Sequence, residues 1–259
     1  MEPVIFKISG SLTDSTDQMD AIISLIAEKR DLGDLPIVVH GGGKQINELS
    51  KKMGIDVIQH EGRRVTDEQT LEVLTYTIGG SVNRGIVSKL RSVEIPAVGL
   101  TGVDGLVTTA IRRPPIEIQN KLIDFGLVGE ISDFDPTLIK ILLNNGFVPV
   151  IGCLTWSKNE GILNINADTF SNKLASAVGA KEMIMFMDVD AVLDADKRPI
   201  TELTYDGFLE GKREGWIRDG MIPKLETGFD SLKKGVPIVR IGSPQGYLSG
   251  ISTKLIGKA

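Results

Sequence analysis

A short β-branched run that ends in three consecutive glycines constrains the fold of this chain more than any other feature. Residues 37–39 form the run, Gly41–Gly43 follow it, and residues 46–53 then show apolar positions at helical spacing. This order predicts a buried parallel strand, a sharp turn and a helix, because glycine lets the backbone turn tightly and approach a ligand closely. The N–H groups of such a turn and the positive end of its helix form an anion site. The alternative is a strand-to-helix connection that uses glycine for geometry alone.

The composition excludes several classes of protein. With 259 residues, 41% hydrophobic and 24% charged, the chain is typical of a globular protein built as one large α/β domain or two lobes. The net charge of −5 and basic clusters of no more than two residues argue against a nucleic-acid surface. The single Cys153 excludes an internal disulfide. Because the sequence has no leader pattern and no apolar run of membrane length, we expect a cytoplasmic protein without membrane contact.

Lys7 follows the first predicted strand, at residues 4–6, and a helical pattern between residues 19 and 26 leads from there to the central strand. This order is typical of a βαβ unit, which predicts a parallel sheet with ligands at the carboxyl ends of its strands. We therefore expect Lys7 at the same edge as Gly41–Gly43. The alternative is a lysine that is simply solvated at the end of its strand.

A pair of arginines, Arg63 and Arg64, precedes a long predicted helix over 66–91 with an apolar stripe along its length. Thr66 and Gln69 predict a capping box at its start. An arginine in this loop can clamp a carboxylate with its planar fork, or it can be solvated. Glycines inside the helix are costly unless another element packs closely against them, so we expect this helix to contact a second subunit.

Acidic residues mark two further ends of predicted elements. Asp168 stands at the start of a helix, where an aspartate commonly serves only as the N-cap. A buried strand over 183–187 ends in the acidic loop 188–193, and residues 219–226, which include Lys224, open the last long helix. The other predicted elements are hairpins over 106–131, a helix from 135 to 146, and strands at 95–100, 148–151, 237–241 and 254–256.

Six short motifs occur in one order along the chain: Lys-x-x-Gly, His-Gly-Gly-Gly, Gly-x-Arg-Val-Thr-Asp, Asn-x-Asn-Ala-Asp, Asp-Val-x-x-Val-Leu and Gly-Met-Ile-Pro-Lys. Together they resemble the amino acid kinase superfamily, most closely its N-acetylglutamate kinases of arginine biosynthesis. The resemblance implies an α/β fold of the carbamate kinase-like type, a three-layer αβα sandwich with a mainly parallel central sheet. It also implies a single domain over 1–259. An N-terminal lobe over about 1–170 would bind the acyl-amino acid and dimerise, and a C-terminal lobe over about 171–259 would bind the nucleotide.

The resemblance implies that the chain transfers a phosphoryl group from MgATP to the side-chain carboxylate of an N-acylated glutamate, N-acetyl-L-glutamate. Lys7 and Lys224 would flank the transferred group, and Asp168 would orient both lysines. No general base is needed, because a carboxylate with a pKa of about 4.3 is already ionised at neutral pH. The transition state requires countercharge and positioning. Backbone N–H groups for the phosphate would come from Gly10, Gly42 and Gly43.

The resemblance also assigns the two ligand sites. Arg64 and Asn164 would hold the α-carboxylate of the substrate, with Gly42 and Gly43 beside them. The nucleotide would bind at the acidic loop and the start of the last helix. Mg²⁺ would bridge the phosphates, and no metal ligand is assigned in the protein. The residues expected at the nucleotide are Asp188, Val189, Asp190, Leu193 and Met221.

Three positions depart from the family pattern: Ser9 and Ala191 replace glycines, and Arg63 replaces an apolar residue. Arg63 bears on the substrate, because an additional cation suits an additional carboxylate. N-succinylglutamate is therefore an alternative substrate, whereas an Arg63 turned to solvent leaves N-acetylglutamate. A carrier-protein-linked aminoadipate or glutamate is a further alternative within the superfamily.

Two alternatives lie outside this activity. A non-catalytic amino-acid-sensing module would not need both lysines and Asp168. A dinucleotide-dependent enzyme would need the spaced glycine fingerprint, and Gly-Gly-Gly-Lys is neither that fingerprint nor the nucleotide P-loop. The sequence begins directly at the first strand, without the additional N-terminal helix of arginine-inhibited relatives. From this the resemblance implies a homodimer without arginine feedback, joined through helix 66–91.

Overall fold

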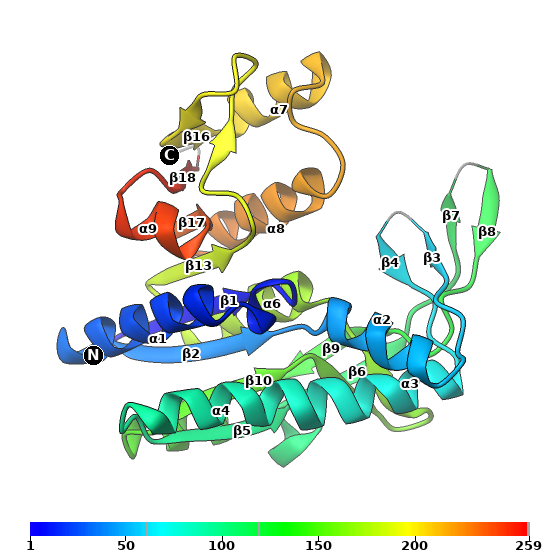
Figure 1. Cartoon of the computed structure of the whole chain (residues 1–259). Helices are drawn as coiled ribbons and strands as arrows, with labels where there is room; N and C mark the ends of the chain where they lie inside the picture. The colour runs from blue at the N-terminus through cyan, green and yellow to red at the C-terminus, as the bar shows by residue number, and fades with distance from the viewer. Residues whose placement is uncertain (61, 119, 258–259) are drawn as a thin grey trace. The chain divides into compact units, whose positions relative to one another are not determined.

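The computed structural model describes residues 1–60, 62–118 and 120–257, and its contacts divide the chain into two compact units. The first unit combines Met1–Val39 with the chain from Ser171 onward, and the second is His40–Phe170. The chain enters the second unit at His40, directly before the glycine turn (Figure 1). It leaves that unit two residues after Asp168. Both crossings therefore fall at motifs that the sequence singled out.

Buried apolar strands form the sheet of the first unit, in the order β16-β18-β17-β13-β1-β2. β1 runs parallel to β13, with Lys7 opposite Met185, and β13 runs parallel to β17, whereas β18 is antiparallel to β17. Burial on both faces explains the continuous apolar sequences of β1 and β13. The strands are β1 (Pro3–Ile8), β2 (Leu35–His40), β13 (Glu182–Phe186), β16 (Glu202–Thr204), β17 (Ile238–Gly242) and β18 (Thr253–Ile256), with the short pair β14 (Val192–Leu193) and β15 (Pro199–Ile200).

Two helices of the first unit were not predicted from the sequence. α8 begins at Met221, as predicted for the last long helix, and α1 begins after Ser15, whose hydroxyl accepts the N–H of Gln18. The two unpredicted helices are α7, which Thr204 caps and the left-handed Gly215 ends, and α9, which Ser243 caps. The helices are α1 (Thr16–Asp31), α7 (Tyr205–Glu214), α8 (Met221–Lys233) and α9 (Pro244–Leu248).

The second unit contains a parallel strand pair and a separate four-stranded sheet. β5 and β10 are parallel, and the four-stranded sheet has the order β12-β11-β6-β9. The hairpins predicted over 106–131 are present: β6 pairs with β9 in antiparallel fashion, and β7 and β8 form a small hairpin between them. The strands are β3 (Gln59–His60), β4 (Arg63–Arg64), β5 (Ala97–Thr101), β6 (Thr108–Arg112), β7 (Ile116–Ile118), β8 (Lys121–Ile123), β9 (Gly129–Phe134), β10 (Val148–Gly152), β11 (Leu154–Ser157) and β12 (Gly161–Asn164).

The long helix predicted over 66–91 is helical from 68 to 92, but its middle is π-helical. It comprises α3 (Glu68–Leu74), the π-helical segment η2 (Thr75–Val82) and α4 (Asn83–Ser92). The apolar stripe repeats every four residues from 74 to 90, a spacing that suits the wider turn of a π-helix. Asn83, the first residue of α4, directly follows the π-helical segment and is fully buried.

The start of this helix corrects a prediction. The side chain of Asp67 accepts the N–H of Thr70 over 2.8 Å, so Asp67 is the N-cap. The capping box of Thr66 and Gln69 is therefore wrong, because a better capping carboxylate stands one residue later. The remaining helices are α2 (Gly43–Lys52), α5 (Thr137–Asn144) and α6 (Ala167–Val178), the last of which contains the boundary between the units.

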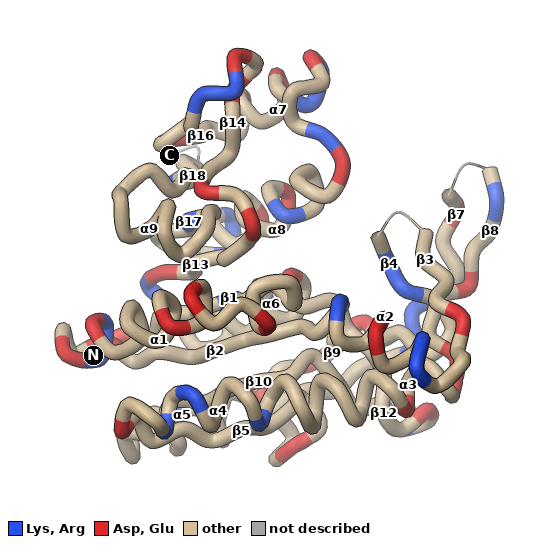
Figure 2. Tube along the Cα trace, viewed as in Figure 1, with Lys and Arg blue, Asp and Glu red and all other residues tan. Residues whose placement is uncertain are grey.

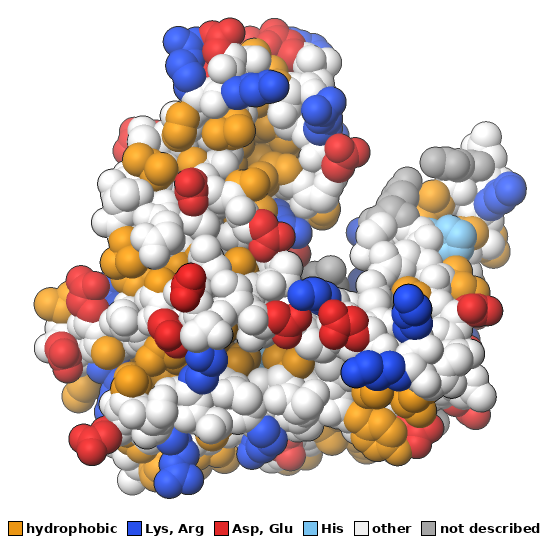
Figure 3. Space-filling model, in the orientation of Figure 1, with side chains coloured by type: hydrophobic (Ala, Val, Ile, Leu, Met, Phe, Trp, Pro, Cys, Tyr) orange, Lys and Arg blue, Asp and Glu red, His pale blue; other side chains and the backbone are white. Residues whose placement is uncertain are grey.

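Charged residues of both signs are interspersed along the trace (Figure 2). On the face drawn in Figure 3, the described residues form no extended basic patch, and acidic and basic side chains lie close to one another. Within the described ranges, no helix combines the length and the apolar character needed to cross a lipid bilayer.

Candidate active site

The glycine turn lies in the second unit, packed against η2 and the start of α6. β2 ends at His40 and α2 begins at Gly43, so the predicted strand, turn and helix are present. A Cβ added to Gly42 would lie 3.5 Å from side-chain atoms of Thr77 and Ile78, and one added to Gly41 would lie 3.7 Å from the Cβ of Ala167. Ala167 directly precedes Asp168, so the turn and the first turn of α6 are neighbours.

Asp168 is not the cap of its helix. The side-chain oxygen of Asn166 accepts the N–H of Asp168 over 2.8 Å and that of Thr169 over 3.3 Å, which is the pattern of an N-cap. Asp168 is the second residue of α6, where its charge is favourable to the helix dipole. The simple capping role considered for Asp168 is therefore filled by Asn166.

Arg64 is partly buried beside the glycine turn. Its Nη2 donates to the Oδ1 of Asn47 over 2.6 Å and lies 3.5 Å from the carbonyl oxygen of Gly43. Its Nη1 is buried and has no hydrogen-bond partner among the described residues. A buried guanidinium N–H without an acceptor is costly, and burial also lowers the pKa of Arg64. An anionic ligand at this point would satisfy the orphaned donor.

Asn164 is linked to the strand of Arg64 by a hydrogen bond to Thr66. Its Nδ2 donates to the hydroxyl of Thr66 over 3.1 Å, and its backbone N–H donates to the carbonyl of Leu127. Thr66 is fully buried and stands two residues after Arg64. The second unit thus gathers four predicted site elements: the glycine turn, Arg64, Asn164 and Asp168.

Lys7 belongs to the first unit, near the carboxyl end of β1. Only 4% of the residue is exposed, so it is not simply a solvated lysine. The next residues hold the neighbouring strand: the N–H of Ser9 donates to the carbonyl of Phe186, and the hydroxyl of Ser11 donates to the carboxylate of Asp188 over 2.6 Å. The turn that contains Gly10 and the acidic loop after β13 are therefore neighbours, as the parallel sheet predicts.

Asp190 has a structural partner. Its carboxylate accepts the hydroxyl of Ser243, the residue that caps α9. A Cβ added to Gly246 would lie 2.1 Å from the Asp190 carbonyl oxygen, so the backbone of the acidic loop packs directly on α9. Val189 and Leu193 from the same predicted set are exposed. The loop is thus anchored at Asp190, with apolar side chains presented on either side.

Lys224 and Met221 lie in the first turn of α8. No side chain caps this helix, whose N-cap position is Gly220. A cation in the first turn is unfavourable to the helix dipole, whereas an anion there is favourable. The backbone of this turn has few donors left for a ligand: the N–H groups of Met221 and Ile222 donate to the carbonyls of Arg218 and Asp219, and Pro223 has no N–H. What the turn can offer a phosphate group is therefore the charge of Lys224.

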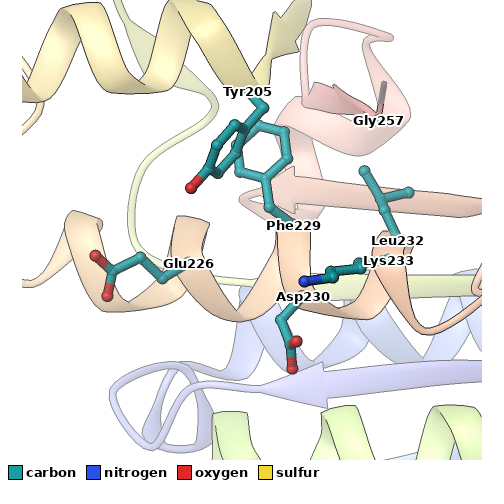
Figure 4. A pocket seen from close by; sticks show the side chains of 7 residues that line it. All are labelled: Tyr205, Glu226, Phe229, Asp230, Leu232, Lys233 and Gly257. Atoms are coloured by element: carbon teal, nitrogen blue, oxygen red, sulfur yellow. The ribbon is translucent and has the colours of Figure 1, made fainter. Parts of the chain in front are cut away.

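A cavity of about 540 Å³ lies elsewhere in the first unit (Figure 4). The rings of Tyr205 and Phe229 meet there edge to face, with centroids 5.3 Å apart and planes at 79°. None of the residues that line this cavity is among the site residues predicted from the sequence. The lining consists of Tyr205, Glu226, Phe229, Asp230, Leu232, Lys233 and Gly257.

Three polar residues near the predicted site, His40, Asn47 and Asn83, were not predicted from the sequence to have a role there. Asn47 holds Arg64, and Asn83 contacts the imidazole of His40 over 3.0 Å. Both contacts join residues that are far apart in the chain, so no local sequence pattern predicts them. No role for His40 was predicted from the sequence, although its place immediately before the glycines was the available signal.

Comparisons with known proteins point to one family over most of the chain. The model of the Amino acid kinase family matches residues 2–243. The Acetylglutamate kinase of Cytophaga hutchinsonii is 37% identical over 244 residues, which cover 92% of this chain and 89% of that protein.

Solved structures agree with this similarity. The structure of smu.665 from Streptococcus mutans UA159 aligns with a TM-score of 0.80 at 27% identity, over 93% of this chain and 94% of that one. Carbamate kinase from Giardia aligns with a TM-score of 0.68 at 15% identity, over 99% of both chains, a likeness of fold alone. The predicted α/β fold of the carbamate kinase-like type, with its mainly parallel sheet, is confirmed.

Proposed function

The chain belongs to the amino acid kinase family, and from that premise we propose that it transfers the terminal phosphoryl group of ATP to the side-chain carboxylate of N-acetyl-L-glutamate. This reaction is an early step of arginine biosynthesis. The observation that carries the substrate assignment is the buried Nη1 of Arg64, which has no acceptor among the described residues and lies beside the glycine turn. The name of the Cytophaga relative supports the same assignment.

Arg64 and Asn164 bind the α-carboxylate in this proposal. A carboxylate gives the orphaned Nη1 an acceptor and neutralises a half-buried guanidinium whose partners among the described residues are neutral. Asn47 fixes Nη2, so the guanidinium plane is already oriented before the ligand arrives. Asn164 is oriented in the same way by Thr66.

The phosphoryl transfer uses countercharge and backbone donors. The bond between the terminal phosphorus and the bridging oxygen of ADP breaks as a bond from the side-chain carboxylate oxygen forms, and ADP leaves. Lys7, Lys224 and the N–H groups of Gly10, Gly42 and Gly43 stabilise the negative charge on the transferred group. Asp168 is the acidic organiser of this set. No base is needed, because the carboxylate nucleophile is already ionised.

The nucleotide belongs to the first unit in this proposal. The residues there suit a phosphate chain: the first turn of α8 offers Lys224, and the Gly10 turn lies beside the acidic loop. Asp188 stays in place through Ser11, and Val189, Leu193 and Met221 supply apolar contacts. Mg²⁺ usually binds through substrate phosphates and one or two carboxylates, and it would neutralise phosphate charge here.

The acyl group is acetyl in this proposal. Arg63 and Arg64 are consecutive residues of β4, so their side chains leave opposite faces of the strand. Arg64 points to Asn47, and Arg63 is exposed. An exposed arginine on the other face does not add a cation to the Arg64 site. This supports N-acetylglutamate over N-succinylglutamate.

We also infer a homodimer joined through the helix 68–92, which exposes Tyr76 on its surface and Val93 at its end. Sedimentation equilibrium should give twice the chain mass, and a monomer at micromolar concentration would contradict the inference.

A coupled assay of ADP release tests the proposed function. We expect release from ATP and Mg²⁺ to depend on N-acetyl-L-glutamate, with a lower kcat/KM for N-succinylglutamate and no release with L-glutamate. Release that is independent of the acceptor would refute the assignment, and a higher kcat/KM for the succinyl compound would refute the role given to Arg63. A non-catalytic sensor would bind N-acetylglutamate without releasing ADP.

A further inference from the structure

A buried chain of hydrogen bonds lies behind the glycine turn. The imidazole of His40 is fully buried, with Nδ1 2.8 Å from the carbonyl oxygen of Gly41 and Nε2 3.0 Å from the Nδ2 of Asn83. The same Nδ2 lies 2.9 Å from the carbonyl oxygen of Val150 and 3.3 Å from that of Leu100. All of these groups belong to the second unit.

The two strand carbonyls settle which atoms donate in this chain. The amide nitrogen of Asn83 must face them, because its oxygen would meet two other acceptors. The Nη2 of Arg84 donates to the Asn83 oxygen and supports the same orientation. The Gly41 carbonyl can only accept, so the proton of a neutral imidazole is on Nδ1, and Nε2 turns its lone pair toward the Asn83 amide. Nδ1 therefore donates to the Gly41 carbonyl.

This donation sets the direction of one peptide group. In a trans peptide, the carbonyl of one residue and the N–H of the next point in opposite directions, and the described chain has no cis peptide bond. With the Gly41 carbonyl turned toward the imidazole, the N–H of Gly42 points away from it. The next peptide is fixed differently: the Gly42 carbonyl accepts the N–H of Ile46, so the N–H of Gly43 points out of the start of α2.

We propose that His40 is a positioning residue, whose Nδ1–H holds the Gly41–Gly42 peptide so that the Gly42 N–H is presented to the transferred phosphoryl group. The inference rests on the proposed function, in which Gly42 is one of the phosphate donors. Asn83 selects the tautomer that makes the contact, and the π-helical turn before α4 accompanies its burial. Burial also lowers the pKa of His40 to about 4, so the imidazole stays neutral throughout the physiological range.

Two substitutions at the same position separate positioning from packing. The side-chain nitrogen of an asparagine reaches about as far as Nδ1, and that of a glutamine about as far as Nε2. His40→Asn therefore keeps a donor for the Gly41 carbonyl, whereas His40→Gln keeps an amide in the cavity but moves it toward Asn83. We expect kcat of His40→Asn within about threefold of the unsubstituted chain, and kcat of His40→Gln lower by about 10- to 100-fold, with smaller changes in either KM.

A second readout does not depend on turnover. In the ligand-free proteins, the backbone amide resonance of Gly42 should keep its position in His40→Asn and move in His40→Gln. Cys153→Ser is the matched control, because Cys153 donates to the backbone carbonyl of His40 from the same buried layer without touching the Gly41 carbonyl. This variant should retain kcat and the Gly42 resonance.

The outcomes distinguish the two proposals. If the unsubstituted chain does not phosphorylate N-acetylglutamate, the proposed function fails, and the Gly42 resonance still decides whether His40 orients this peptide. If the chain is active but folded His40→Gln matches His40→Asn in kcat and in the Gly42 resonance, the positioning role is refuted. Should His40→Gln not fold, Asn83→Ser removes the donor to Nε2. It should lower kcat several-fold, and an unchanged kcat would refute the inference.

Discussion

The guanidinium of Arg64 donates through Nη2 to the side-chain oxygen of Asn47 over 2.6 Å, while its Nη1 remains buried without an acceptor in the described part of the chain. One nitrogen is thus anchored by the helix that follows the glycine turn, and the other is left for a ligand. The arrangement predicts that Asn47 contributes to substrate affinity without contacting the substrate.

Replacing Asn47 by alanine should raise KM for N-acetylglutamate about fivefold and change kcat little. The reason is that one hydrogen bond to the guanidinium, worth about 1 kcal/mol, no longer holds it in the binding orientation. Steady-state kinetics at saturating ATP measure the effect. Lys52→Ala, an exposed substitution on the same helix, is the control and should leave KM unchanged. An unchanged KM in Asn47→Ala would show that Arg64 does not need this anchor.

Arg64→Lys should be nearly as damaging as Arg64→Ala, with KM for N-acetylglutamate raised roughly 100-fold in both. A lysine keeps the charge but cannot donate to Asn47 and to a carboxylate at once in the planar geometry of a guanidinium. Titration of the acceptor at fixed ATP provides the measurement. Arg63→Lys is the matched control on the exposed face of the same strand. If Arg64→Lys bound the acceptor as tightly as the unsubstituted chain, charge alone would explain the site.

His40 predicts a specific loss of stability in acid. Its pKa is lowered to about 4 in the folded protein by burial, whereas an unfolded histidine has a pKa of about 6.5. Between these values the unfolded chain binds a proton that the folded chain does not, so the free energy of unfolding falls as the pH falls, by about 3 kcal/mol in total. The contribution is complete above about pH 6.5.

Urea titrations from pH 4 to pH 7 measure this slope. The comparison of the unsubstituted chain with His40→Asn isolates the histidine, because both proteins share the same carboxylates. The asparagine variant should show a shallower decline over this interval. Parallel curves for the two proteins would contradict the assignment of a buried neutral imidazole.

Glu182 should matter for stability and not for catalysis. Its carboxylate is buried at the start of β13, where Lys29 lies 2.6 Å and Arg240 3.5 Å away, whereas the proposed nucleotide loop follows the other end of this strand. Glu182→Gln leaves two cations without their counterion. We expect a loss of about 2 kcal/mol, less than for a fully buried pair because both cations reach solvent. Thermal unfolding tests the loss, and kcat of the folded variant should be unchanged.

The sequence sufficed for the strand, turn and helix around Gly41–Gly43, because a buried strand and a glycine turn each have a recognisable local pattern. It also sufficed for the family, through six motifs in order. The start of the long helix was misjudged because Thr66 and Asp67 are both good caps, and only the backbone shows which one is used. The same ambiguity applied to Asp168, which lies two residues after the true cap, Asn166.

The contacts that support the site could not be predicted from the sequence for a different reason. Asn47 meets Arg64, and Asn83 meets His40, across 17 and 43 positions of the chain. Neither asparagine belongs to a motif, and each is recognisable only once burial shows which polar atoms need a partner. Asn83 also directly follows a π-helical segment, which was not predicted from the sequence.

The central claim is that ATP phosphorylates the side-chain carboxylate of an N-acylated glutamate with the help of Lys7. Hydroxylamine converts an acyl phosphate to a hydroxamate, so trapping the product with N-acetyl-L-glutamate, ATP and Mg²⁺ measures the new bond itself. We predict one hydroxamate for each ADP formed, and a rate at least about 100-fold lower for Lys7→Met. ADP formation without hydroxamate, or a Lys7→Met variant as fast as the unsubstituted chain, would contradict the account.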